Sequence, residues 1–233
     1  MRLWLTVAVV LAASPATACR QALALGLDIS SSVDEGEYRL QIDGVIAALT
    51  APAVHDILFR QPDAPIRVLV YEWSGPADQH IIVPWSDLRT EADLARVTGL
   101  LSAHDRSTGA ETTAIGSALL FGYRALAGQG DCWRRTLDLS GDGPSNTGPA
   151  PATIRPDGVT VNALVIGSDN LRGDDARLGD VKELSGYFRE NVIGGPDAFV
   201  EVALGYPDYA NALERKLLRE LSSLVIGGLA PDP

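Results

Sequence analysis

The sequence predicts an α/β protein with one three-layer, doubly wound domain on a mostly parallel six-stranded sheet with one antiparallel edge strand. Strand-like and helix-like segments alternate along the 233 residues, which favours parallel strands joined by right-handed helical crossovers. The chain is 46% apolar and 21% charged, as in soluble globular proteins with a core. No internal repeat or shift in composition marks a second domain.

The first half of the chain begins with an apolar run, 21–28, which reads as a strand. The segment 34–49 follows with the 3.6-residue apolar periodicity of a helix. The strongly apolar run 66–73 is expected to be a central strand. Only a short turn separates it from 79–83, too short for a helical crossover, so this pair should form an antiparallel hairpin at a sheet edge.

The second half continues the alternation. Three further strands are expected, at 134–139, 159–166 and 198–204. Helices are expected at 91–103, 115–126, 180–190 and 209–224. The last of these carries leucines in register on one face, which is typical of a helix packed against a sheet.

The N-terminus has the pattern of a signal peptide. Arg2 precedes an apolar stretch at 3–13, and Ala16-Thr17-Ala18 fits a cleavage site. Residues 1–18 are therefore expected to be removed, leaving a domain at 19–226 and a flexible tail at 227–233. The chain should be periplasmic or secreted, and no other segment has the length of a membrane span.

Cys19 and Cys132 are the two cysteines. In an exported protein an even cysteine count predicts a disulfide. The rival interpretation makes Cys19 a lipidated first residue, but Ala16 stands where such signals usually have leucine. The formal net charge of −11 argues against nucleic acid or an anionic membrane as partner, since both attract clustered Lys and Arg.

Three segments carry candidate metal ligands. Asp28, Ser30 and Ser32 follow the first expected strand, Thr113 precedes an expected helix, and Asp142 lies between two glycines after another strand. Ligands of open α/β sheets bind at the carboxyl ends of the strands. Carboxylates and hydroxyls are hard oxygen ligands, which suit Mg²⁺, Mn²⁺ or Ca²⁺. Taken singly, each motif is more often a helix cap or a turn.

With these motifs in order, the chain resembles the von Willebrand factor A family over about residues 20 to 226. The resemblance implies a metal-dependent adhesion site made of Asp28, Ser30, Ser32, Thr113 and Asp142. It implies hydroxyl groups as direct ligands, carboxylates bound through water, and a coordination position completed by an Asp or Glu of a partner protein. Phrases such as Glu72-Trp73-Ser74-Gly75 and 192–199 look like an uncharacterised secreted bacterial branch.

The family's sheet order would also make the strands after Cys19 and Cys132 parallel neighbours, within disulfide distance. In the family, rearrangement at the metal can couple to the C-terminal helix, here 209–224. The loop 167–179 is expected to move with that helix.

Two other functions stay open. One is a metal-dependent hydrolase of phosphoesters, and the other is a structural module stabilised by the ion. The protein is not expected to be an enzyme, because no histidine or unclaimed carboxylate can be assigned as a general base. His55, His80 and His104 share no metal-ligand spacing. A surface around Trp73 and Trp85 is the alternative recognition site.

Overall fold

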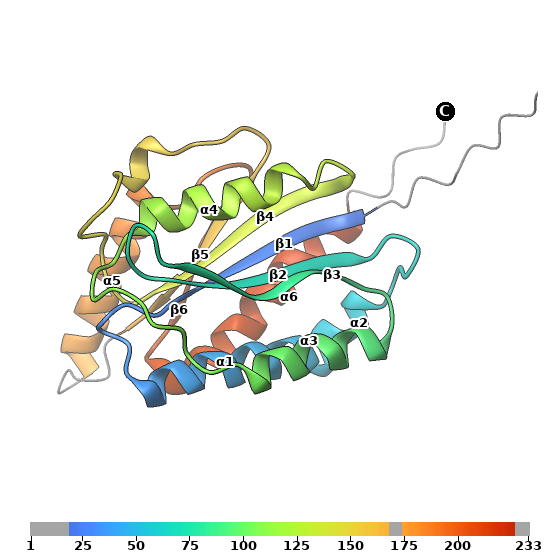
Figure 1. Ribbon diagram of the computed structural model, residues 1–233, viewed down its shortest axis with the longest axis horizontal. Helices are drawn as coiled ribbons and strands as arrows, with labels where there is room; N and C mark the ends of the chain where they lie inside the picture. Colours follow the sequence, from blue (N-terminus) through green and yellow to red (C-terminus); the bar gives the residue numbers. More distant parts are fainter. Residues whose placement is uncertain (1–18, 168–173, 227–233) are drawn as a thin grey trace, which may run out of the picture.

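A six-stranded sheet forms the centre of the computed structural model, which describes residues 19–167 and 174–226 (Figure 1). The strand order is β3-β2-β1-β4-β5-β6. All neighbouring strands are parallel except β2 and β3, which form an antiparallel pair at one edge. The strands are β1 (Cys19–Asp28), β2 (Ile66–Trp73), β3 (Gln79–Leu88), β4 (Cys132–Gly141), β5 (Thr160–Ile166) and β6 (Val200–Ala203). The expected mostly parallel sheet with an antiparallel edge strand is confirmed.

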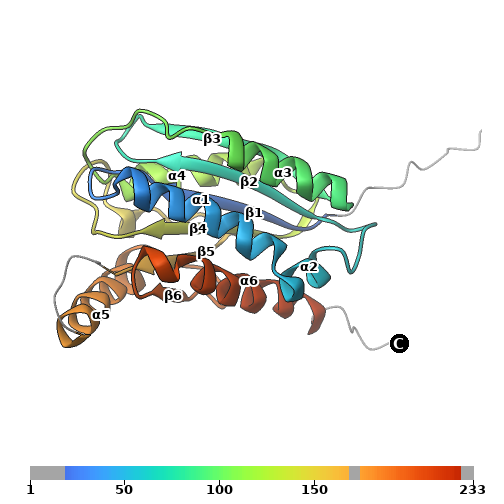
Figure 2. The ribbon, with the colours of Figure 1, turned by 90° about the horizontal axis from the view of Figure 1, so that it is seen from below.

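Helices cover both faces of the sheet (Figures 1 and 2). One apolar cluster joins β1 and β2 to four of the helices, and a second joins the opposite face to the other two. The first group is α1 (Glu35–Thr50), α2 (Pro52–Leu58), α3 (Glu91–Ala103) and α6 (Tyr209–Ile226). The second group is α4 (Ile115–Ala127) and α5 (Asp174–Asn191). Two short 3-10 helices, η1 (Pro151–Thr153) and η2 (Tyr206–Asp208), complete the described elements.

The starts of α1 and α3 follow from local sequence. Asp34 accepts a hydrogen bond from the Glu37 amide, and the Glu37 carboxylate accepts one from the Asp34 amide. Thr90 and Asp93 make the same reciprocal pair at the start of α3. Such capping boxes satisfy amides that a helix leaves unpaired at its first turn. The cap at Asp34 fixes where α1 begins after the loop that follows β1.

Three elements differ from the expectation. The helix α2 was not predicted, since its seven residues are too short for a clear period. The helix α5 begins at residue 174 rather than 180, so 174–179 is helix and not loop, while 168–173 lies outside the described residues. Strand β3 runs on to Leu88 through Pro84. An edge strand tolerates proline because one row of its amides has no ladder partner.

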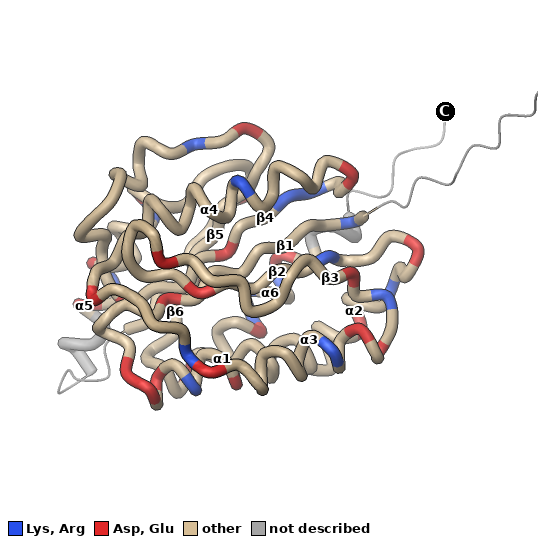
Figure 3. The backbone as a smooth tube through the Cα atoms, in the orientation of Figure 1, with Lys and Arg blue, Asp and Glu red and all other residues tan. Residues whose placement is uncertain are grey.

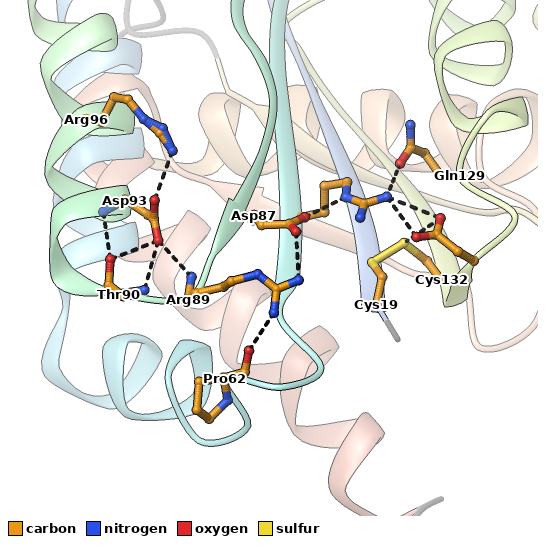
Figure 4. Close-up of polar contacts among 11 residues, drawn as sticks. Cys19, Pro62, Asp87, Arg89, Thr90, Asp93, Arg96, Gln129 and Cys132 are labelled. Carbon is orange, nitrogen blue, oxygen red and sulfur yellow. Dashed lines mark hydrogen bonds and ion pairs between the residues drawn. A yellow bond between two sulfur atoms is a disulfide. The ribbon is translucent and has the colours of Figure 1, made fainter. Parts of the chain in front are cut away.

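The disulfide joins Cys19 and Cys132 at the starts of β1 and β4, where the two residues lie in register. Figure 4 shows it beside a polar network that includes Asp87, Arg89 and Gln129. The expected pairing is confirmed. The expected signal peptide at 1–18 and tail at 227–233 lie outside the described residues. Of the helices that the structure describes, none has both the length and the apolarity to cross a membrane.

Candidate metal centre

The candidate centre lies where the two middle strands of the sheet end. Asp28 is the last residue of β1, and Asp142 follows directly after β4. These strands are parallel neighbours, and the strand order reverses on either side of β1. Ligands of open α/β sheets bind at such a switch point. Both carboxylates therefore lie at the carboxyl ends of the central strands, and the disulfide lies at the opposite ends of the same strands.

A chain of hydrogen bonds joins four of the five expected residues. The Ser30 amide donates to Asp28 Oδ1 at 2.8 Å. The hydroxyls of Ser30 and Ser32 are 3.2 Å apart. The Ser32 hydroxyl donates to Asp142 Oδ1 at 2.7 Å. The loop after β1 and the loop after β4 are thus linked through a serine and a carboxylate.

Thr113 lies in the segment just before α4. Its backbone is held by Asn146, which lies in the loop after β4. Its amide donates to Asn146 Oδ1 at 2.9 Å, and its carbonyl accepts from the Asn146 amide at 2.9 Å. The Ser31 hydroxyl donates to the Glu111 carbonyl at 2.7 Å, which ties the loop after β1 to the same segment. The Thr113 hydroxyl makes no hydrogen bond with any residue in 19–167 or 174–226. The Thr113 hydroxyl is therefore not part of the series of hydrogen bonds that joins the other four residues.

The centre holds an acceptor without a partner. Asp28 is fully buried, and within the described residues its Oδ2 atom has no hydrogen-bond donor. A Cβ atom at Gly141 would lie 3.5 Å from that oxygen, so β4 passes close beside it. An unsatisfied buried carboxylate oxygen costs free energy unless a cation or donor reaches it.

Electrostatics point the same way. Burial first, and then the negative charge of Asp142, raise the pKa of Asp28 to about 8. Hydrogen bonds from Ser30 and, to a smaller degree, the charge of Arg106, which donates to the Ile29 carbonyl at 2.9 Å, offset only part of this rise. Two carboxylates that repel each other in a buried place are stabilised by a bound cation. The residues present therefore fit a hard divalent ion, for which Asp28, Ser30, Ser32 and Asp142 supply nearby oxygen ligands.

The structure adds residues that the sequence pattern did not predict. The Tyr206 hydroxyl, in η2, donates to Asp142 Oδ2 at 3.1 Å. Burial and the neighbouring Asp142 raise the pKa of Tyr206 well above its ordinary value, so it stays a donor. Tyr206 lies 64 residues from Asp142 along the chain, and no short motif relates them. Only the topology brings them together.

The other candidates lie elsewhere. His104 hydrogen-bonds Glu72 at 3.2 Å and His55 pairs with Glu91 at 2.6 Å. Within the described residues no group of three His, Cys, Asp or Glu could hold a metal, so an ion here would depend on hydroxyl oxygens as well as carboxylates. Trp73 cannot line a recognition surface, because its side chain is fully buried within the second apolar cluster, whereas Trp85 is only partly buried against that cluster.

Comparison with known proteins places the chain in a family. A family model described as "Protein of unknown function (DUF1194)" matches residues 18–225. The chain belongs to this DUF1194 family. No curated protein matches the sequence.

Solved structures share the fold of this DUF1194 protein at low identity. One is proximal thread matrix protein 1 from the mussel byssus with a zinc-occupied MIDAS motif, at 18% identity and TM-score 0.56, covering 88% of this chain and 48% of that one. The PilB minor pilin of Streptococcus sanguinis is 12% identical with TM-score 0.64, covering 92% and 64%. BatB of Bacteroides thetaiotaomicron is 18% identical with TM-score 0.51, covering 88% and 98%.

These likenesses show the fold alone, and they confirm that the chain has the expected doubly wound fold with a von Willebrand A-like arrangement of strands. The chain spans about half of the mussel protein's length.

Metal affinity is expected to rise with pH. Below about pH 8 the metal-free Asp28 carboxyl holds a proton, which a cation must displace, so affinity for Mg²⁺ should fall by up to about tenfold for each pH unit below that value. Calorimetric titrations at pH 6, 7 and 8 would measure the affinity, and buffers of different ionisation enthalpy would count the released protons. Equal affinity at the three pH values, with no proton release, would contradict this.

Proposed function

We propose that this protein is an exported von Willebrand A-like binding protein that holds Mg²⁺, or else Mn²⁺ or Ca²⁺, and binds a partner protein through it. The proposed metal-binding residues are Asp28, Ser30, Ser32, Thr113 and Asp142. The partner would present an Asp or Glu carboxylate to the ion. The observation that carries the proposal is the buried, partnerless oxygen of Asp28 beside a chain of hydroxyls and a second carboxylate.

The ligand set favours recognition of an acidic group. Hydroxyl ligands carry no charge, so an ion held by Ser30, Ser32 and Thr113 keeps a positive field toward solvent. A bound divalent ion supplies an electrophilic contact for a carboxylate oxygen. Ser32 lies at the exposed side of the centre, where a partner could approach. Tyr206 and Arg106 hold the surrounding loops in place through Asp142 and the carbonyls after β1.

We infer binding rather than catalysis. Apart from the proposed ligands themselves, the described side chains that hydrogen-bond to them are hydroxyls, two amides and a guanidinium. None of these is a base that activates water at neutral pH. The adhesin and pilin neighbours, among them SpaC of Lactobacillus rhamnosus GG and PilB, support a role in protein interaction outside the cytoplasm.

The test compares metal with EDTA, using the immobilised mature protein and a cell-envelope extract. We expect a partner to bind in Mg²⁺ or Mn²⁺, to be released by EDTA, and to lose at least about tenfold in affinity for Thr113→Ala. That loss corresponds to about 1.4 kcal/mol, the scale of a charge-assisted contact.

Thr112→Ala is the matched control, because it removes the same hydroxyl from the adjacent position and should bind as wild type does. Binding that is unchanged by EDTA would place the interface away from the metal. Metal binding without any EDTA-sensitive partner would favour a structural ion, and metal-dependent turnover of generic phosphoesters would favour the hydrolase.

A further inference from the structure

A second polar centre lies at the other end of the sheet from the candidate metal centre. A cavity of about 260 Å³ opens beside the first halves of β4 and β5 and the end of α6. A water molecule occupies about 30 Å³ of liquid, so this space can take a small molecule. Its lining includes Arg134, Thr136, Asn162, Phe199, Arg219 and Glu220. No residue of the candidate metal centre lines it.

The floor of the cavity is a preformed buried network. The Asn162 side chain accepts from the Phe199 amide at 3.0 Å and donates to Glu220 Oε1. The Lys216 ammonium, fully buried, reaches the same Glu220 oxygen at 2.6 Å and also contacts Asp138. Burying three charged groups is costly, and such a group adds little to stability over an apolar core. The network does fix the wall residues Phe199 and Glu220 in position, as binding sites require.

Two guanidinium groups line the same cavity, in a chain with 19 Lys and Arg against 30 Asp and Glu. The Arg219 guanidinium carbon lies 3.8 Å from the centre of the Phe199 ring. Arg219 makes no hydrogen bond or ion pair with the residues in 19–167 or 174–226. Stacking on an aromatic ring holds the guanidinium plane and leaves its N–H edge for a ligand. Figure 3 shows basic residues near the start of β4. The sequence there contains Arg134 and Arg135 in succession.

The carboxylate of Glu220 does not oppose an anion strongly. Burial and the neighbouring Asp138 raise the pKa of Glu220 to about 8, although Lys216 offsets part of the rise. Near neutral pH the raised pKa of Glu220 favours its uncharged form, and the Lys216 ammonium lies against it. The cationic side chains Arg134 and Arg219 then set the charge at the cavity, while Asp197 contributes a carboxylate at its exposed rim.

We propose that this cavity binds a small oxyanion, a carboxylate or a phosphate, between Arg134 and Arg219. Guanidinium groups present paired N–H donors that match the oxygens of both anions. The Phe199 ring supplies an apolar wall for the rest of a small ligand. The loop at 192–199, which the candidate metal centre leaves without a role, supplies that wall.

The experiment is calorimetric titration of the mature protein, in EDTA, with inorganic phosphate and separately with succinate. We expect saturable binding of at least one anion, and the stronger of the two identifies the class. Arg219→Gln and Phe199→Leu should each weaken it at least tenfold. Arg215→Gln removes the same charge from the same helix, outside the cavity, and should bind as wild type does.

Thermal melting of each variant checks folding, and Arg219→Gln is the decisive one because its side chain is exposed. Absence of saturable binding by either anion up to about 10 mM would overturn the proposal. Equal weakening in Arg215→Gln would also overturn it, since the effect would then be diffuse attraction to a basic helix. Titration in EDTA keeps this result separate from the metal-bridged interaction.

Discussion

Asp142→Ala is expected to abolish divalent-metal binding while the protein still folds. The Asp142 carboxylate joins Ser32 at one oxygen and Tyr206 at the other, so its removal takes away both a charge and the link between two loops. A metal present at a hundred times its dissociation constant stabilises the folded state by about 2.7 kcal/mol. In a domain of this size that corresponds to a gain of roughly 5 to 11 °C in melting temperature. The variant should show no gain.

Melting curves with excess Mg²⁺ and with EDTA provide the measurement. In EDTA the variant should lose at most about 1 to 3 kcal/mol of stability, from the hydrogen bonds of Ser32 and Tyr206. Relief of the charge repulsion that helps to raise the pKa of Asp28 offsets part of that loss. Asp63→Ala removes an equal charge from the exposed loop before β2 and should keep the full metal-dependent gain. A variant that is unfolded at room temperature would show the ion to be structural. A variant that still binds metal would mean that the ligands are wrongly assigned.

Loss of the disulfide should have the largest effect on stability. The bond closes a stretch of 113 residues, for which the chain-entropy model gives at most about 4 to 5 kcal/mol. The Cys19→Ala, Cys132→Ala double variant should therefore unfold at lower urea concentration. Metal binding should be kept, because the bond lies at the opposite end of β1 and β4 from Asp28 and Asp142.

Wild-type protein treated with a reductant should match the double variant, which separates the bond from the side chains. Mass spectrometry under non-reducing conditions should show the wild-type chain two hydrogens lighter than the reduced one. Two free thiols, or a lipid on Cys19, would contradict the assignment.

The sequence predicted the sheet well because each strand combines an apolar run with a clear stop. Asp28 and Gly141 end the two middle strands, and the motifs that follow them were found from chemistry alone. Thr113 was a candidate from its place before an expected helix, and the structure shows its backbone held by Asn146. Asn146 has no signal of its own, since an asparagine in a loop is usually a turn residue.

Other features depend on contacts that no local pattern encodes. The helix at 209–224 was expected from its leucines, but the complete burial of Lys216 was not. A lysine is almost never buried unless paired, and its partner Asp138 comes from β4. Helix α2 is missed for a different reason, because its seven residues make only about two turns, too few repeats of the period.

Strand β3 has a consequence for how the molecule can meet other chains. It carries Pro84 within its length, and its pairing with β2 shifts register twice. Proline and register shifts disrupt the row of free amides and carbonyls that an edge strand offers. At the opposite edge, β6 is only four residues long. Both borders of the sheet are therefore poor templates for adding a strand from another molecule, which protects the chain from fibre-like association.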